Sequence, residues 1–324
     1  MNIVFLLGNG FDKNLDLPTS YREFYEYYLH QHSDTKVVNE LKHAIQTDLD
    51  NGGKDWADLE KALGQHAATW TSCDEACEAC RDINRHLKAY LSGIDLSQVE
   101  VGTIGAELYL PTHYFSRSEQ QRISNICSFN LGAQDIVDVI TFNYTKTLER
   151  LLPDNSTTNR QKLYVRGSRT GYLGRILHIH GTLDDSEVIL GVNDPSQIAN
   201  ESLRDNPRAL GWLVKPTMTL ERGDMIDTQC EQLITGANVI CMHGLSMGDT
   251  DTKWWRLIGE HLPGLNLVLL FYFDTDAFDF TPDIRDHERQ IRENFLRKCL
   301  PDDDRRSRFD DKVLIAYKSS IFRG

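Results

Sequence analysis

The sequence predicts an α/β fold in which helices cover both faces of a mostly parallel β-sheet. Short apolar runs of strand length recur along the chain, and helical segments separate several of them. Glycine-bearing turns follow some of these runs, where parallel strands end and ligands commonly bind. With 324 residues, 40% of them hydrophobic, the chain is long enough to bury a substantial core.

Seven apolar runs are predicted to be strands: 2–7, 136–141, 175–179, 187–192, 238–242, 265–273 and 312–316. Helices are predicted between several of them, at 145–152, 226–236, 251–261 and 283–298. Near the start, Ser20 and Glu23 form a capping-box pattern in front of an aromatic helix. Residues 153–174 are polar and rich in turn formers, which is consistent with an exposed loop or a hairpin.

Residues 34–133 have a mostly helical pattern without strand alternation. We therefore expect a helical insertion or subdomain at 34–133, inside an α/β domain formed by 1–33 and 134–324. This helical block either covers a binding pocket or mediates self-association into a homo-oligomer, and the sequence leaves both alternatives open.

Three cysteines in the helical block, Cys73, Cys77 and Cys80, have the spacing that puts them on one face of a helix. Three thiolates could bind zinc, but no further ligand pair follows at the spacing of a zinc site. The pattern therefore favours cysteines that pack as small apolar side chains. The sequence gives no reason to expect a metal.

The formal net charge of −13 restricts the kinds of partner. Such an acidic surface repels phosphate backbones, which argues against direct nucleic-acid binding, although backbone amides can still hold a small anionic ligand. No apolar run reaches the ~18 residues of a membrane-spanning helix. The apolar start has neither a basic n-region nor a cleavage site. We therefore expect a cytoplasmic protein that does not enter membranes.

The first candidate binding segment is Gly8-Asn9-Gly10, followed by Asp12, directly after the first predicted strand. In an open α/β sheet, ligands bind outside the carboxyl ends of the strands. Two glycines permit a tight turn and a close approach of the backbone to a ligand. The segment lacks the full G-x-G-x-x-G pattern of dinucleotide-binding turns, so a turn that only requires positive φ is the alternative.

Asn143 and His180 follow the next two predicted strands. Thr145 is suited to cap the helix after Asn143, and a capping or turn role for Asn143 itself is the alternative. His180 precedes a glycine at a strand end, where an imidazole can act as a general base near neutral pH. With His178 it could instead bind a metal, but no third ligand is evident nearby. We expect His178 to be a satisfied core histidine.

The turn after the fifth predicted strand contains the pattern Gly-x-Ser-x-Gly around Ser246. Between a strand and a helix, this pattern marks the nucleophile of α/β-hydrolases. A serine hydrolase would also need an acid and then a histidine later in the chain. Asp274 and Asp276 could supply the acid, but the only histidine after them lies in a charged helical segment. The alternative is that Gly244, Ser246 and Asp249 line the phosphates and ribose of a nucleotide.

These segments together resemble the AbiH family of bacteriophage abortive-infection proteins. The segments that carry the resemblance are LLGNGFDKNLDLPTSY near the start, WADLE at 56–60, TFNYT at 141–145, HIHGTL at 178–183 and HGLSMGDTD at 243–251. The likeness extends from the first residues to about 255. It implies a defence protein that answers a phage-derived trigger, which the sequence does not name.

The AbiH family is in turn similar to SIR2-like proteins, which bind NAD in a Rossmann-type domain. This similarity implies a Rossmann-like (SIR2-like) fold with a nucleotide pocket. It implies a role for each matching residue: Gly8-Asn9-Gly10 as the first glycine turn, Asn143 as the strand-end asparagine, His180 as the catalytic histidine, and Gly244 and Ser246 as the turn that meets the nucleotide. The cysteine pairs that hold zinc in sirtuin deacylases are absent from the sequence, so peptide deacylation is not implied.

We therefore hypothesise an NAD glycohydrolase of anti-phage defence, with NAD as substrate or ligand. Cleavage of the nicotinamide–ribose bond would pass through an oxocarbenium-like state. Asn143 would orient water or the ribose hydroxyls, and His180 would accept a proton. Asp12, Asp249 or Asp251 could bind ribose hydroxyls. Two other hypotheses stay open: a serine hydrolase built on the Gly-x-Ser-x-Gly turn, and a nucleotide- or phage-sensing module without turnover.

Overall fold

A computed structural model describes most of the chain. The described residues are 1–97, 99, 104–109, 112–127, 134–152, 162–166, 169–272, 280–317 and 319–322. Asp274 and Asp276, the candidate acids of a serine hydrolase, lie outside these residues.

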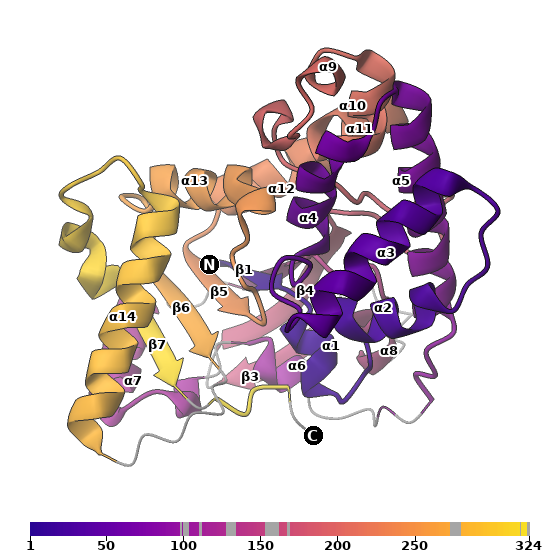
Figure 1. Cartoon of the computed structure of the whole chain (residues 1–324). Coiled ribbons are helices and arrows are strands. Elements are labelled where there is room, and N and C mark those ends of the chain that lie inside the picture. The colour runs from indigo at the N-terminus through magenta and orange to yellow at the C-terminus, as the bar shows by residue number, and fades with distance from the viewer. Residues whose placement is uncertain are drawn as a thin grey trace.

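A seven-stranded, mostly parallel sheet forms the centre of the described structure, which confirms the predicted α/β fold class (Figure 1). Its strands are β1 (Asn2–Leu7), β2 (Asp135–Thr141), β3 (Lys162–Arg166), β4 (Arg169–His178), β5 (Val239–His243), β6 (Leu267–Tyr272) and β7 (Val313–Tyr317). Their order is β3-β4-β2-β1-β5-β6-β7, and only β3 runs antiparallel to its neighbour. Counted in chain order, the parallel strands are therefore arranged 3-2-1-4-5-6, the order of the Rossmann fold.

Alternating side chains of β1 enter two different cores, because successive residues of a strand point to opposite faces. Ile3, Phe5 and Leu7 lie in one core, and Val4 and Leu6 lie in the other. The first core includes residues of α1 (Gly10–Asn14), α6 (Ile104–Glu107), α7 (Arg117–Cys127) and α8 (Thr147–Leu151), and the second includes residues of α12 (Ile226–Thr235), α13 (Thr252–His261) and α14 (Thr281–Cys299). Helices therefore cover both faces of the sheet, as predicted.

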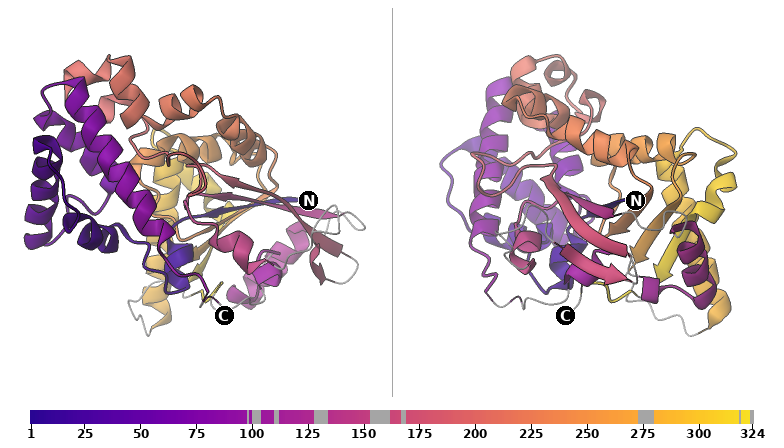
Figure 2. Two further views of the ribbon diagram at one scale, coloured as in Figure 1. Left: turned by 90° about the vertical axis from the view of Figure 1, so that its right-hand side faces the viewer. Right: turned by 180° about the vertical axis from the view of Figure 1, so that it is seen from behind.

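A helical lobe stands beside this α/β body, and Figure 2 shows the same separation from the side. The lobe consists of α2 (Tyr21–Leu29), α3 (Lys36–Asp50), α4 (Leu59–His66), α5 (Cys73–Ser92), α9 (Glu201–Arg204), α10 (Pro207–Leu213) and α11 (Lys215–Arg222). Short 3₁₀ helices occupy Ala67–Thr69, Thr112–Tyr114, Pro195–Gln197, Asp249–Asp251 and Arg306–Lys312. Ser20 and Glu23 form the predicted capping box at the start of α2. Cys77 and Cys80 are buried on α5.

The cores do not follow the domain boundary that the sequence suggests at residue 133. The helices α6 and α7 belong to the expected helical block, yet Leu108 and Ile123 pack into a core of the sheet. Conversely, Val188 and Leu213, from the expected α/β domain, help to fill the core of the helical lobe. Two segments that are distant in sequence thus build the lobe together, because each covers the apolar face of the other.

The predicted strand at 187–192 is wrong. Within the described structure this segment joins no strand of the sheet, and it makes only an isolated bridge between Val192 and Val214. The N–H of Ile189 donates to the carbonyl oxygen of His180 at 2.9 Å. Val188, Leu190 and Val192 of this segment are buried in the core of the helical lobe. The apolar run therefore reflects burial among helices, which periodicity alone does not distinguish from a buried strand.

The loops after β1 and β5 pack directly on each other, at the point where the strand order reverses. The N–H of Gly10 donates to the carbonyl oxygen of Gly244 at 2.9 Å, and the N–H of Gly8 donates to that of His243 at 3.0 Å. A Cβ atom on Gly10 would lie 2.4 Å from the Cα atom of Gly244, whose own φ is +70°. The close approach and the positive φ therefore require glycine at these two positions.

We predict that Gly10→Ala lowers the free energy of unfolding by about 2 kcal/mol or more, since backbone atoms block the added methyl group. Gly264→Ala is the matched control, because its added Cβ would lie 3.6 Å from the nearest neighbour, the carbonyl oxygen of His261. Urea unfolding followed by circular dichroism measures both variants. Equal stability of Gly10→Ala and the unmodified protein would contradict the prediction.

Candidate functional site

The carboxyl ends of β4, β2, β1 and β5 lie next to one another, so the fold gathers the turns that follow these strands along one edge of the sheet. In the turn after β1, the N–H groups of Gly8 and Gly10 are used in the contact with the β5 loop. The Asn9 side chain is held by Thr19, whose hydroxyl donates to Oδ1 of Asn9 at 2.6 Å. The backbone N–H groups of Gly8 and Gly10 and the side chain of Asn9 are therefore already engaged within the protein.

Asp12 is buried in α1, beside the turn after β2. Thr145 donates its hydroxyl to Oδ2 of Asp12 at 2.5 Å instead of capping α8, which begins at Thr147. Burial raises the pKa of Asp12, while the neighbouring side chains of Thr145, Thr147 and Asn143 oppose that shift. Oδ1 of Asp12, Oδ1 of Asn143 and Oγ1 of Thr147 are buried and have no hydrogen-bond partner within the described part of the chain. Hydroxyl groups of a ligand could satisfy these oxygens.

The aromatic side chains on either side of Asn143 in the sequence, Phe142 and Tyr144, lie against His180. The ring centroids of Phe142 and Tyr144 lie 5.5 Å and 6.4 Å from that of the imidazole. Trp255 stacks on Phe142 with a centroid distance of 5.5 Å. Two aromatic rings thus lie against His180, which is itself buried, and the low polarity around it strengthens the electrostatic interactions of its imidazole.

The two histidines do not share a binding site. β4 ends at His178, and His180 lies in the turn beyond it. Both ring nitrogens of His178 are engaged, Nδ1 with the carbonyl oxygen of Asn143 at 2.9 Å and Nε2 with Glu149 at 2.7 Å. His178 is therefore a satisfied core histidine. Among the described residues, no group of three or more His, Cys, Asp or Glu side chains is arranged to hold a metal ion.

His180 belongs to a buried cluster of four ionisable side chains at the junction of the helical lobe and the α/β body. Its Nε2 lies 3.2 Å from Oδ1 of Asp251. Nζ of Lys215 lies 2.8 Å from the same oxygen and 2.6 Å from Oε2 of Glu60. Glu60 comes from α4 and Lys215 from the start of α11, whereas the other two side chains come from the loops after β4 and β5. Both lobes therefore contribute to one polar centre.

Burial and the attraction between opposite charges together determine the pKa values in this cluster. Burial alone would lower the pKa of Lys215, but Asp251 and Glu60 raise it above its ordinary value. Burial alone would raise the pKa of Asp251, but Lys215 and His180 hold it well below its ordinary value. Burial raises the pKa of Glu60, and the charge of Asp251 adds to this shift against the attraction of Lys215. One lysine thus pairs with two carboxylates.

Nε2 of His180 lies within reach of both an acceptor and a donor. Oδ1 of Asp251 is 3.2 Å away and would accept a proton from Nε2, whereas Nζ of Lys215 is 3.4 Å away and would donate one to it. These two contacts require different tautomers of the imidazole. An imidazole beside a carboxylate is suited to general-base chemistry.

Sequence reasoning identified His180 and Asp251 but not Glu60 and Lys215. Glu60 is the last residue of the WADLE segment, yet a glutamate in a helical pattern is usually solvent-exposed. Lys215 lies in a region where the sequence predicts no element. Lysine is almost never fully buried unless it is paired, so only the three-dimensional contact reveals these two residues.

Asp249 and Ser246 lie in the same loop as Asp251 but have different surroundings. Asp249 binds Lys298 at 2.5 Å and Lys61 at 3.1 Å, and these hydrogen bonds lower its pKa. In the described structure, no hydrogen bond joins the Ser246 hydroxyl to a histidine, and the positive φ angles of the turn fall on its neighbours rather than on the serine. The turn therefore lacks the paired base and the strained serine of a nucleophile elbow.

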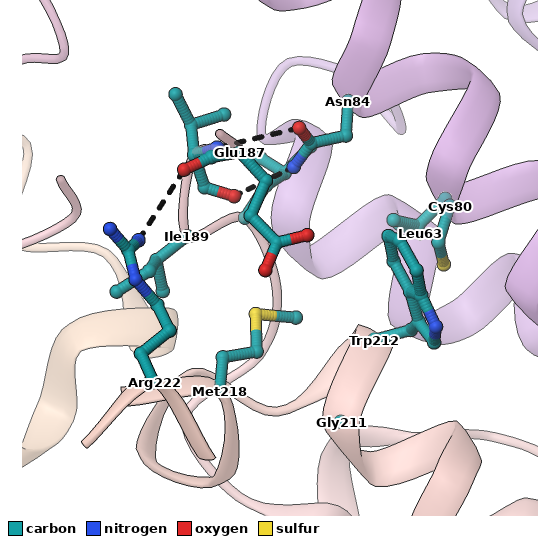
Figure 3. Close-up of a pocket in the computed structure, with 11 residues that line it drawn as sticks. Leu63, Cys80, Asn84, Glu187, Ile189, Gly211, Trp212, Met218 and Arg222 are labelled. Atoms are coloured by element: carbon teal, nitrogen blue, oxygen red, sulfur yellow. Dashed lines mark hydrogen bonds between the residues drawn. The ribbon is translucent and has the colours of Figure 1, made fainter. Parts of the chain in front are cut away.

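Two cavities lie away from these residues. One is in the helical lobe, where Glu187, Trp212 and Arg222 line a space of about 10 Å³, enough for a single water molecule (Figure 3). Asn84 supports its wall by donating to the carbonyl oxygen of Val188 at 2.7 Å. The other is a groove of about 740 Å³ between the turn after α1 and the end of α5. Neither of these two cavities is lined by a member of the buried cluster.

A comparison with protein-family models matches residues 4–273 to "Bacteriophage abortive infection AbiH". The match spans the helical lobe and the sheet through β6, and it includes all four members of the buried cluster. The chain belongs to the bacteriophage abortive infection AbiH family. None of the curated proteins compared with this AbiH chain matches it. Across the described parts of the AbiH chain, no helix combines the length and the apolar character needed to cross a membrane.

We predict that Lys215→Met destabilises the AbiH protein by about 3–5 kcal/mol, because it leaves two buried carboxylates without their cation. Lys61→Met is the matched control, since Lys61 follows Glu60 directly and its pair with Asp249 is about half exposed (56% and 48%). That variant should lose at most about 1 kcal/mol. Urea unfolding at neutral pH measures both, and similar losses would refute the account of a buried ion cluster.

We predict that the contribution of Asp251 to the stability of the AbiH protein depends on pH. Its pKa in the folded protein lies below the unfolded value of about 3.9, so the ionised group stabilises the fold above that pH. The contribution is lost as the pH falls below about 4. Asp251→Asn should therefore be less stable than the unmodified protein at neutral pH, and the difference should shrink in acid. Urea midpoints at several pH values test this, and a difference independent of pH would contradict it.

Proposed function

We propose that this protein is an abortive-infection effector that cleaves the nicotinamide–ribose bond of NAD, with His180 as the general base. Family membership supports the defence part of the proposal. The strand order supports the nucleotide part, and it is the observation that carries the proposal. Sheets of this order bind dinucleotides where the order reverses, which here is between β1 and β5.

The polar groups at that edge of the sheet suit a ribose. Ribose hydroxyls donate hydrogen bonds, and the buried Oδ1 atom of Asn143 has no hydrogen-bond partner among the residues described. The glycine turn suits phosphates less well, because the N–H groups of Gly8 and Gly10 are already used. Binding of a pyrophosphate there would require the β1 and β5 loops to separate.

The charge of the buried cluster suits the cleavage step. Loss of nicotinamide develops positive charge on the ribose. When Glu60 and Asp251 are both ionised around Lys215, their excess negative charge would stabilise that charge, because these side chains are largely buried. The imidazole of His180 would accept a proton from water or from a ribose hydroxyl, and Asp251 would stabilise the imidazolium that forms. Asn143 would orient the water or the ribose.

The burial of the cluster has a consequence for activity. His180, Glu60 and Lys215 are buried, so access of a substrate to His180 would require α4 and α11 to move relative to the α/β body. A protein of this kind is silent until something opens the junction. Such control suits a defence enzyme that depletes a nucleotide which the host cell also needs, with a phage component as the trigger.

We predict that cells expressing the protein lose NAD and accumulate nicotinamide when a phage that it restricts infects them. His180→Ala should lower the rate of NAD loss about 10²–10⁴-fold, the usual effect of removing a general base. Mass spectrometry of cell extracts measures both metabolites, and Lys61→Met provides a control with a nearby surface change.

Phage restriction with unchanged NAD, or NAD loss that His180→Ala leaves undiminished, would reject the proposal. A fluorophosphonate probe that labels the unmodified protein but not Ser246→Ala would favour a serine hydrolase instead. Tight binding of NAD without any product in triggered cells would favour a sensing module.

A further inference from the structure

We propose that Glu60 and Lys215 are positioning residues whose opposite charges set how readily His180 takes up a proton. The helical lobe then does more than cover the α/β body, because it supplies a charged group to the centre of that body. The catalytic consequence of this inference rests on the proposed function. The proton uptake of His180, in contrast, can be measured in the resting protein without any substrate.

The contacts join the four side chains into one electrostatic unit. Oδ1 of Asp251 lies 3.2 Å from Nε2 of His180 and 2.8 Å from Nζ of Lys215. Nζ of Lys215 lies 3.4 Å from Nε2 of His180 and 2.6 Å from Glu60. The side chains of Glu60 and Lys215 are only 7% exposed, so water and salt screen these charges little.

The other groups around the imidazole are uncharged or already paired. Asp251 before α13, Lys215 on α11 and Tyr144 after β2 lie beside the imidazole. Behind them, Glu60 on α4 pairs with Lys215, and Tyr21 on α2 lies beside Tyr144. Burial raises the pKa of both tyrosines well above the ordinary value, so they remain uncharged phenols. Beside Gly181, Arg222 and Asp185 pair with each other at 3.4 Å, and their charges offset. The charges of Asp251, Lys215 and Glu60 therefore dominate.

Removal of either charge shifts the protonation of His180 in a direction that the sign of the charge decides. Lys215→Met removes a cation close to the imidazole, so the imidazolium becomes more stable and keeps its proton to higher pH. Glu60→Gln removes an anion and leaves Lys215 to Asp251 alone, so the imidazole releases its proton at lower pH. A charge within 4–6 Å shifts such a midpoint by about one pH unit or more.

The test is an NMR titration of the full-length protein labelled at histidine ¹³Cε1, with the His180 signal assigned by its loss in His180→Gln. We expect the midpoint to rise by about one pH unit in Lys215→Met and to fall in Glu60→Gln. It should lie between these values in the double variant and stay unchanged in Lys61→Met. Because Lys215→Met alone leaves two carboxylates unpaired, the double variant compared with Glu60→Gln gives the same information in a background with one carboxylate fewer.

If Glu60 and Lys215 had a purely structural role, their substitution would reduce stability, but the His180 titration midpoints would not follow the sign of the charge removed. Midpoints that move in the same direction in both variants, or that stay unchanged in Glu60→Gln, overturn the proposal. The acid limb of kcat/KM for NAD cleavage should follow the same order. Ordered midpoints without NAD cleavage in triggered cells would retain the positioning residues and reject NAD hydrolysis. NAD cleavage with unchanged midpoints would retain NAD hydrolysis and reject the positioning role of the two residues.

Discussion

Burial of the Lys215 ammonium group is the constraint on which the arrangement of the helical lobe and the α/β body depends. An isolated charge in a protein interior costs several kcal/mol, so Lys215 must meet carboxylates. Glu60 comes from the helical lobe, and Asp251 comes from the loop after β5. A movement of the lobe that separated either pair would leave a charge unpaired. The ion cluster therefore specifies the relative orientation of the lobes in a way that non-directional apolar packing does not.

Backbone hydrogen bonds in the chain between His180 and Lys215 connect the position of the lysine to that of His180, the candidate base. The carbonyl oxygen of His180 accepts from the N–H of Ile189, and the N–H of Lys215 donates to the carbonyl oxygen of Val192 at 2.9 Å. The segment 189–192 thus binds the backbone of His180 at one end and the backbone of Lys215 at the other. Leu190 and Val192 of that segment belong to the core of the helical lobe, so the packing of the lobe fixes the backbone at both positions.

Local patterns predict most of the sheet but only half of the buried cluster. The strands β1, β5 and β7 are predictable because buried parallel strands read as continuous apolar runs. The same signal fails at 187–192, where helices rather than strands bury the run. His180 and Asp251 can be found because they follow strand ends. Glu60 and Lys215 cannot, because their pairing joins helices that are remote in sequence and leaves no periodic trace.

The loop after β5 takes part in two contacts, one with the loop after β1 and one with the buried cluster. Gly244, at its start, is in backbone contact with Gly10, and Asp251, at its end, binds Lys215 and His180. Positive φ angles at Gly244 and Met247 mark where this loop turns between them. A single short loop therefore takes part both in the glycine contact at the carboxyl end of β1 and in the buried cluster.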